Sequence, residues 1–140
     1  MDKITITRDA VLSMEREARN AYPKEACAVL LGNLQEKIVD EIHVLKNLSN
    51  GEEAHRFFRI DPLALYELEG RVEEIGKDIV GFFHTHTHHE AILSAEDEQY
   101  MIPGMVYFIL SLTDETDQRI KAYEKRFSDS EALEKEIKRK

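Results

Sequence analysis

The sequence predicts a mixed α/β fold with a central β-sheet, and two patterns carry that prediction. Near the start of the chain, in residues 7–23, apolar residues recur at helical spacing. From residue 26 onward, short apolar segments of strand type alternate with polar turns and with further helical stretches. The 140 residues contain neither an internal repeat nor a low-complexity linker, so we expect one domain over residues 1–140.

The first helical segment is expected to be amphipathic. Thr7 has a short hydroxyl side chain of the kind favoured at a helix N-cap, and Pro23 marks the point where the helix must have ended. Apolar residues of the segment share one helix face: Ala10, Val11, Met14, Ala18 and Ala21. This face is expected to pack on the sheet.

A strand pair and a polar connection follow the first helix. Residues 26–33 and 37–48 read as two strands joined by a short turn around residues 32–33. Residues 48–56 are polar and are expected to form a loop, and residues 57–60 are expected to form a short strand. The sheet therefore receives its first strands from the first half of the chain.

A second helix is predicted over residues 61–77. Asp61 is suited to the cap, Pro62 to the first helical position and Gly76 to the end of the helix. The next segment, residues 78–86, is expected to be a buried strand because of its apolar content. This strand ends on the residues of greatest chemical interest.

The last third of the chain is expected to begin with a helix over residues 94–102. Ser94 is suited to its N-cap, and Asp97 follows as its third residue, in a capping-box variant with Asp in place of Glu. Two strands and a solvent-exposed helix with frayed ends are expected to complete the chain: residues 104–112, 119–127 and 129–140.

Composition narrows the range of partners and compartments. The formal net charge is −9, and Lys and Arg cluster only in the last few residues, which argues against nucleic acid and anionic membranes as partners. No apolar run reaches the roughly 18 residues needed to span a bilayer, and the N-terminus lacks the features of a signal peptide. The single cysteine, Cys27, cannot form an internal disulfide. We therefore expect a cytoplasmic protein.

The end of the predicted strand 78–86 carries a candidate metal site. His84 and His86 are two residues apart on this strand, so their side chains are expected on the same face. Asp97 lies one turn into the following helix, where its carboxylate can turn back toward the strand end. Two imidazoles and one carboxylate form a ligand set typical of catalytic zinc and leave a fourth position for water, whose pKa zinc lowers toward about 7. An isolated His-x-His would be equally compatible with two surface histidines.

The spacing of these residues resembles the signature of the JAMM (MPN+) zinc metalloprotease family. In this signature His-x-His is followed after seven residues by Ser and, after two more, by Asp, which are here His84, His86, Ser94 and Asp97. The family also has a glutamate before an apolar segment near the first helix, and the segment EACAVLLG supplies it as Glu25. The two segments together make the resemblance specific.

This resemblance covers most of residues 5–125 and implies both fold and activity. The implied fold is a central, mostly antiparallel β-sheet flanked by helices, the cytidine-deaminase-like architecture of MPN domains. The implied function is zinc-dependent cleavage of the peptide or isopeptide bond after the C-terminal tail of a ubiquitin-like or sulfur-carrier protein. Glu25 would be the general base for a metal-activated water. The Ser94 hydroxyl is expected both to cap its helix and to donate to the developing oxyanion.

Two other functions stay open on the sequence alone. The first is a catalytically silent MPN-type interaction module, which is disfavoured because members of that kind lack some of the ligands present here. The second is a general small-peptide peptidase or amidase that uses the same zinc site. The sequence identifies neither the physiological substrate nor the oligomeric state, and it does not distinguish isopeptide from linear peptide cleavage.

The chain departs from the family pattern directly after the second histidine. Thr87 stands where the family usually has proline, and two further histidines follow, His88 and His89. The missing proline indicates a looser connection rather than a lost site. We expect His88 and His89 to be exposed loop residues, with contacts to substrate or to a second, adventitious metal as the alternative. We expect Cys27 to be a small buried residue rather than a nucleophile.

Overall fold

The computed structural model describes residues 3–45, 62–88, 90–93, 95–99, 101–113, 116 and 119–140. Its elements are, in chain order, β1 (Lys3–Ile6), α1 (Arg8–Ala21), β2 (Cys27–Asn33), β3 (Ile38–Leu45), α2 (Pro62–Glu74), β4 (Asp78–His86), α3 (Ala95–Gln99), β5 (Val106–Ser111), β6 (Ile120–Lys125) and β7 (Ala132–Arg139). None of these helices has the length and apolar character needed to cross a membrane.

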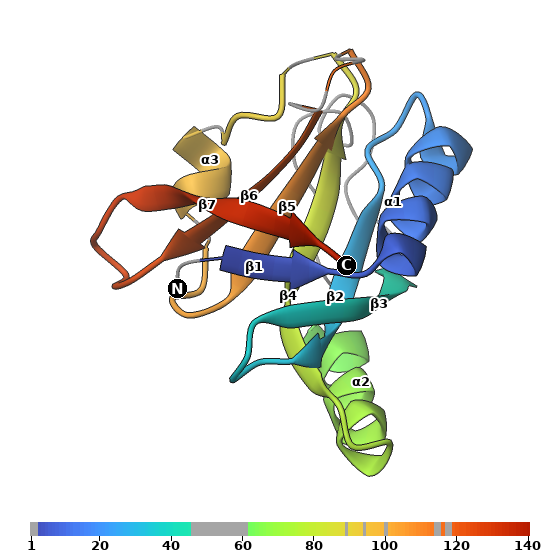
Figure 1. The fold of residues 1–140 in the computed structure, drawn as a ribbon, viewed down its shortest axis with the longest axis vertical. Coiled ribbons are helices and arrows are strands. Elements are labelled where there is room, and N and C mark those ends of the chain that lie inside the picture. The colour runs from blue at the N-terminus through green and yellow to red at the C-terminus, as the bar shows by residue number, and fades with distance from the viewer. Residues whose placement is uncertain are drawn as a thin grey trace.

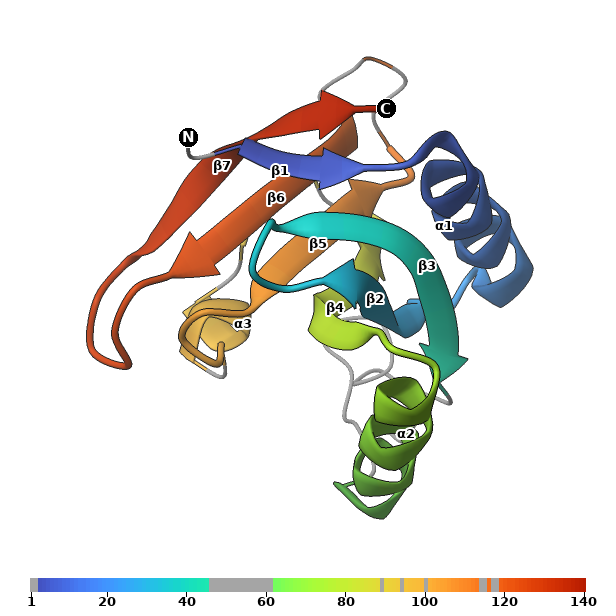
Figure 2. The same ribbon diagram turned by 60° about the horizontal axis from the view of Figure 1, so that its bottom comes forward.

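The strands form one sheet that closes into a barrel. Their order is β1-β3-β2-β4-β5-β6-β7, and β7 pairs with β1 to complete the circle. Pairing is antiparallel for β2 with β3 and β4 and for β6 with β5 and β7, and it is parallel for β4 with β5 and for β1 with both neighbours. The expected mixed α/β fold is confirmed, and closure of the sheet is an additional feature. Figures 1 and 2 show α1 and α3 on opposite sides of the barrel.

Helix α1 forms as its sequence predicts. The Thr7 hydroxyl oxygen accepts a hydrogen bond from the Ala10 N–H at 3.3 Å, which satisfies one of the unpaired amides of the first turn. The buried face consists of the predicted residues Ala10, Val11, Met14 and Ala18. Helix α1 is therefore fixed against the sheet just before the chain enters β2.

The two faces of the sheet carry separate apolar clusters. One cluster joins α1 to strands β1–β6 and includes the fully buried Phe83 and Phe108. The other cluster lies on the opposite face and includes Phe82 and Ile109, with Leu68 of α2 packed against them. Because neighbouring strand residues point to opposite faces, the even-numbered residues at the end of β4 continue the face that α2 covers.

The C-terminal segment is a strand, so the prediction of a helix over residues 129–140 was wrong. Strand β7 pairs with β6 on one side and with β1 on the other. Strand β1 was not predicted, because its four residues, KITI, are too few to show a strand pattern on their own. The two errors have one cause, since β1 and β7 pair with each other from the two ends of the chain, and a local pattern does not show this pairing. Local helix propensity in a charged segment does not outweigh such pairing.

The connection between β2 and β3 also differs from the prediction. The turn lies at residues 34–37, whereas Gly32 lies within β2 beside a β-bulge. A Cβ atom at Gly32 would overlap the backbone carbonyl of Ile38, so glycine permits the close approach of the two strands. The glycine thus marks a bulge and not the turn itself.

The second and third helices agree in part with their predictions. Helix α2 begins at Pro62, as expected, and Gly76 follows its end with φ 74°. Helix α3 spans Ala95–Gln99 and is shorter than the predicted 94–102. The predicted loop 48–56, the strand 57–60 and the cap residues Asp61 and Ser94 lie outside the described residues.

Candidate metal centre

Two histidine side chains converge at the end of β4. His84 and His86 are 2% and 3% exposed, and their Nε2 atoms are 3.2 Å apart. Two imidazole nitrogens that bind one tetrahedral zinc ion at the usual bond length are separated by about 3.3 Å. The spacing of the two nitrogens therefore fits a shared metal ion.

The ring of His86 is oriented by the backbone that follows it. Its Nδ1 atom lies 2.8 Å from the carbonyl oxygen of Glu90, so Nδ1–H donates to that carbonyl. This bond assigns the tautomer in which Nε2 carries the lone pair. A metal-binding histidine is commonly fixed in this way through its second nitrogen.

The third predicted ligand, Asp97, is placed only through its backbone. It lies in α3, and its side chain, like the whole of Ser94, is outside what the structure describes. The helix is anchored by Lys125, whose Nζ donates to the Glu98 carbonyl at 3.0 Å. Within the described side chains, no cluster of three or more His, Cys, Asp and Glu is arranged to hold a metal. The roles of Asp97 and Ser94 stay predictions.

Glu25 lies on the same face of the sheet as the two histidines. Cys27 of β2 is opposite His84 of β4, and the Thr85 N–H donates to the Ala26 carbonyl at 3.1 Å, so the pairing of the two segments extends to the residue next to Glu25. Residues directly opposite each other in an antiparallel pair point to the same side. Glu25 is only 2% exposed, so its side chain is withdrawn from bulk water.

Cys27 shares this environment without being a reactive thiol. Burial raises the pKa of the Cys27 thiol to about 12, and the nearby Glu25 carboxylate acts in the same direction. The thiol is protonated at neutral pH, and a protonated thiol is a poor nucleophile. The expectation of a small buried residue is confirmed.

Sequence reasoning missed two hydroxyl residues beside the histidines. Ser111 of β5 is in register with His86, is 1% exposed and has its Oγ 2.9 Å from the Thr113 hydroxyl. Thr85 lies between the two histidines, is fully buried, and bonds to Ala26 across the sheet. A lone hydroxyl residue in an apolar strand gives no local signal: the register of β4 and β5 brings Ser111 opposite His86, and the pairing of β2 with β4 gives Thr85 its partner.

The segment after His86 is held close to β5. The Leu112 N–H donates to the His86 carbonyl at 3.0 Å, and Thr87, which replaces the family proline, is 3% exposed. His88 is exposed, as expected, with its ring centroid 6.4 Å from that of Tyr22. His89 lies outside the described residues.

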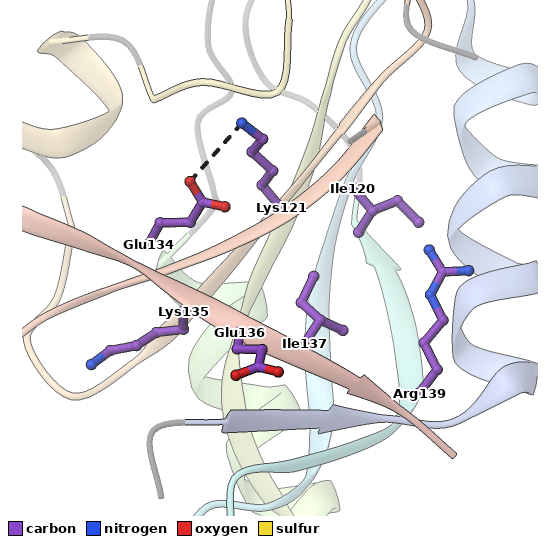
Figure 3. Close-up of a pocket in the computed structure, with 7 residues that line it drawn as sticks. All are labelled: Ile120, Lys121, Glu134, Lys135, Glu136, Ile137 and Arg139. Carbon is purple, nitrogen blue, oxygen red and sulfur yellow. Dashed lines mark ion pairs between the residues drawn. The ribbon is translucent and has the colours of Figure 1, made fainter. Parts of the chain in front are cut away.

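Two surface pockets differ in their relation to this site. A pocket of about 560 Å³ lies at the strand ends and is lined by Arg19, Tyr22, Thr87, His88, Leu112 and Thr113. A second pocket, of about 430 Å³, is formed by β6 and β7 and is drawn in Figure 3. Its lining carries charges of both signs, including an ion pair between Lys121 and Glu134 at 3.9 Å, and contains no histidine or cysteine. The first pocket includes Thr87, the residue directly after His86, but neither His84 nor His86 lines either of these two pockets.

Comparison with known proteins identifies relatives over most of the chain. Residues 7–124 match the family described as prokaryotic homologs of the JAB domain. The chain is 34% identical over 119 residues to a desampylase of Haloferax volcanii, covering 84% of this chain and 81% of the relative. It is 28% identical over 121 residues to a CysO-cysteine peptidase of Mycobacterium tuberculosis, covering 86% and 81%.

Solved structures with the same fold are also found. A protein of Desulfitobacterium hafniense has a TM-score of 0.82 and 29% identity, with 98% of this chain and 92% of that chain covered. A JAB1/MPN domain protein of Archaeoglobus fulgidus has a TM-score of 0.59 and 20% identity, with 96% and 98% covered. The second likeness supports the fold alone.

Proposed function

The chain belongs to the prokaryotic JAB family, and from this premise we propose that it is a zinc-dependent hydrolase. Its substrate is the peptide or isopeptide bond after the C-terminal tail of a ubiquitin-like or sulfur-carrier protein. The names of two relatives, desampylase and CysO-cysteine peptidase, support this substrate class.

One arrangement of side chains supports a metal at the end of β4. The Nε2 atoms of His84 and His86 are 3.2 Å apart, and the Nδ1–H of His86 donates to a backbone carbonyl. Both imidazoles are buried, so a metal held by them would sit against the sheet. Asp97 of α3 is the proposed third ligand. When bound, zinc would supply a Lewis acid that acidifies a water molecule and polarises the scissile carbonyl.

Glu25 is the proposed general base. Its carboxylate would accept a proton from the attacking water and then deliver it to the nitrogen of the leaving amine, as the carbon–nitrogen bond breaks. This role requires a carboxylate beside the metal ligands but not bound to the metal. The burial of Glu25, at 2% exposure and two residues before Cys27, which is opposite His84, is compatible with it. Ser94 is the proposed donor to the oxyanion that forms on the scissile carbonyl.

A cleavage assay tests this function. The protein is incubated with fusion proteins that contain a ubiquitin-like domain ending in Gly-Gly, and in parallel with short unrelated peptides, with and without a chelator. We expect cleavage directly after Gly-Gly, loss of cleavage with chelator and recovery when zinc is added. Equal cleavage of both substrate classes would identify a general peptidase instead. If zinc-loaded protein cleaves nothing, the hydrolase proposal is wrong.

A further inference from the structure

The hydroxyl group of Thr85 links the metal-binding strand to the segment that carries the proposed base. Its Oγ1 accepts a hydrogen bond from the Ala26 N–H at 2.8 Å, and the Thr85 N–H donates to the Ala26 carbonyl at 3.1 Å. Thr85 is fully buried, and Ala26 is 6% exposed. Water is therefore a poor substitute for either bond.

This pairing departs from a regular antiparallel ladder. In a hydrogen-bonded pair of such a ladder, the two residues exchange both N–H···O=C bonds. Here one of the two bonds is regular, but the Ala26 N–H bonds to the threonine side chain. The hydrogen bond of the Ala26 N–H, at the end of the pairing between β2 and β4, thus depends on the side chain at position 85.

The position of this bond connects three groups of the site. The Ala26 N–H belongs to the peptide group that joins Glu25 to Ala26, so the bond fixes the plane of that peptide and the direction in which Glu25 leaves it. Thr85 in turn lies between His84 and His86 in β4. Because neighbouring strand residues point to opposite faces, its hydroxyl is on the far side of the sheet from the imidazoles. It can hold the base in place but cannot touch the reacting atoms.

We propose that Thr85 is a positioning residue that holds Glu25 in register with His84 and His86 through its bond to the Ala26 amide. This inference rests on the proposed function of the site. General-base catalysis requires hydrogen-bond reach to the attacking water, and a displacement of about 1 Å can cost about 100-fold in rate. Loss of the hydroxyl should therefore affect turnover more than substrate binding or zinc binding.

Three variants test the role of the oxygen atom. Thr85→Val keeps the shape but removes the acceptor, and we expect kcat to fall about 10- to 100-fold with KM and zinc content nearly unchanged. Thr85→Ser restores the oxygen and should keep kcat within about threefold of wild type. Thr85→Ala removes the same acceptor and takes the place of Thr85→Val if the valine variant does not fold. A folded Thr85→Val protein with wild-type kcat would overturn the proposal. Equal losses of kcat in Thr85→Val and Thr85→Ser would also overturn it.

A matched control is available on β5. The Tyr107 hydroxyl accepts from the Ile102 N–H at 2.8 Å, so Tyr107→Phe also removes one side-chain oxygen that pairs with a backbone amide. We expect it to lower stability without changing kcat. A similar loss of kcat in both variants would show general destabilisation and would reject a specific role for Thr85.

A double variant and a spectroscopic measurement separate this inference from the proposed function. In a Glu25→Gln background, Thr85→Val should change the residual kcat by less than about twofold, because its effect acts through Glu25. A further tenfold loss would contradict the proposal. In zinc-free protein, the carboxyl ¹³C resonance of Glu25 should move in Thr85→Val but not in Thr85→Ser or Tyr107→Phe. If wild type cleaves no substrate, the proposed function fails, and this resonance still decides the role of Thr85.

Discussion

The strands that carry the candidate metal centre differ sharply from the strands that close the barrel. Strands β2 and β4 are buried along most of their length, whereas β7 has no fully buried residue and β1 is only four residues long. In Figure 2, β1 and β7 lie together at one edge of the view, and α2 projects from the opposite edge. The candidate site therefore lies on the best-packed part of the sheet, while closure depends on the exposed strand β7 and the short strand β1. Substitutions that weaken the pairing of β1 with β7 should leave activity nearly unchanged, whereas substitutions in β2 or β4 should lower it.

The largest effect is expected from loss of the two imidazoles. The double variant His84→Ala/His86→Ala should bind no zinc and have no measurable activity, because one carboxylate cannot hold the ion alone. Elemental analysis of wild type should give one zinc per chain. His43→Ala, on β3, is the matched control and should keep both zinc and activity. Equal zinc content in wild type and the double variant would place the metal elsewhere.

Substitution of Glu25 distinguishes a general base from a metal ligand. Glu25→Gln keeps the size of the side chain but cannot accept a proton, so activity should fall by about 100-fold or more while zinc and fold are retained. Metal content and turnover are measured on the same sample, with the exposed Glu73→Gln variant of α2 as control. Loss of zinc would make Glu25 a ligand, and normal turnover would reject both roles.

Substitution of Ser94 should affect both kcat and stability. If its hydroxyl donates to the oxyanion, Ser94→Ala should lower kcat by about 100- to 1000-fold, and Ser94→Asp should not restore it because a carboxylate repels the developing charge. Loss of the helix cap should add about 1 kcal/mol of destabilisation, which Asp does restore. Melting temperature and kcat of the two variants distinguish these contributions. If Ser94→Ala has a kcat close to that of wild type, the role of Ser94 is limited to capping the helix.

The same contrast explains which features were predictable from sequence. The capped amphipathic helix α1 and the buried strand β4 have local periodicities, and His84 and His86 lie at a spacing that a strand converts into a common face. The position of Glu25 beside them follows from antiparallel pairing of β2 with β4, which local patterns do not encode but the family resemblance anticipates. Thr85 was missed because its partner, the Ala26 amide, is fixed only by that pairing.

The closure of the barrel could not be predicted, because the two strands that close it, β1 and β7, come from opposite ends of the chain. Ile4 of β1 is paired with Ile137 of β7, although the segment around Ile137 alternates acidic and basic residues in a way that also suits a solvated helix. The hydrogen bonds that favour the strand come from β1 and β6. Because β1 comes from the other end of the chain, tertiary pairing rather than local propensity decides the structure of this segment.

The smallest effect on activity is expected from weakening this closure. Ile4 is 2% exposed within the apolar cluster that includes α1, so Ile4→Ala should lower the free energy of unfolding by about 2–4 kcal/mol through lost burial and a cavity. Leu133→Ala changes β7 at a side chain that is 54% exposed and should cost less than about 0.5 kcal/mol. Urea denaturation measures both, and kcat is measured well below the unfolding transition. We expect kcat of folded Ile4→Ala within about twofold of wild type, because β2, β4 and β5 keep their pairing with each other when β1 is weakened. A tenfold loss of kcat with zinc still bound would instead show that the exposed strands hold the site in shape.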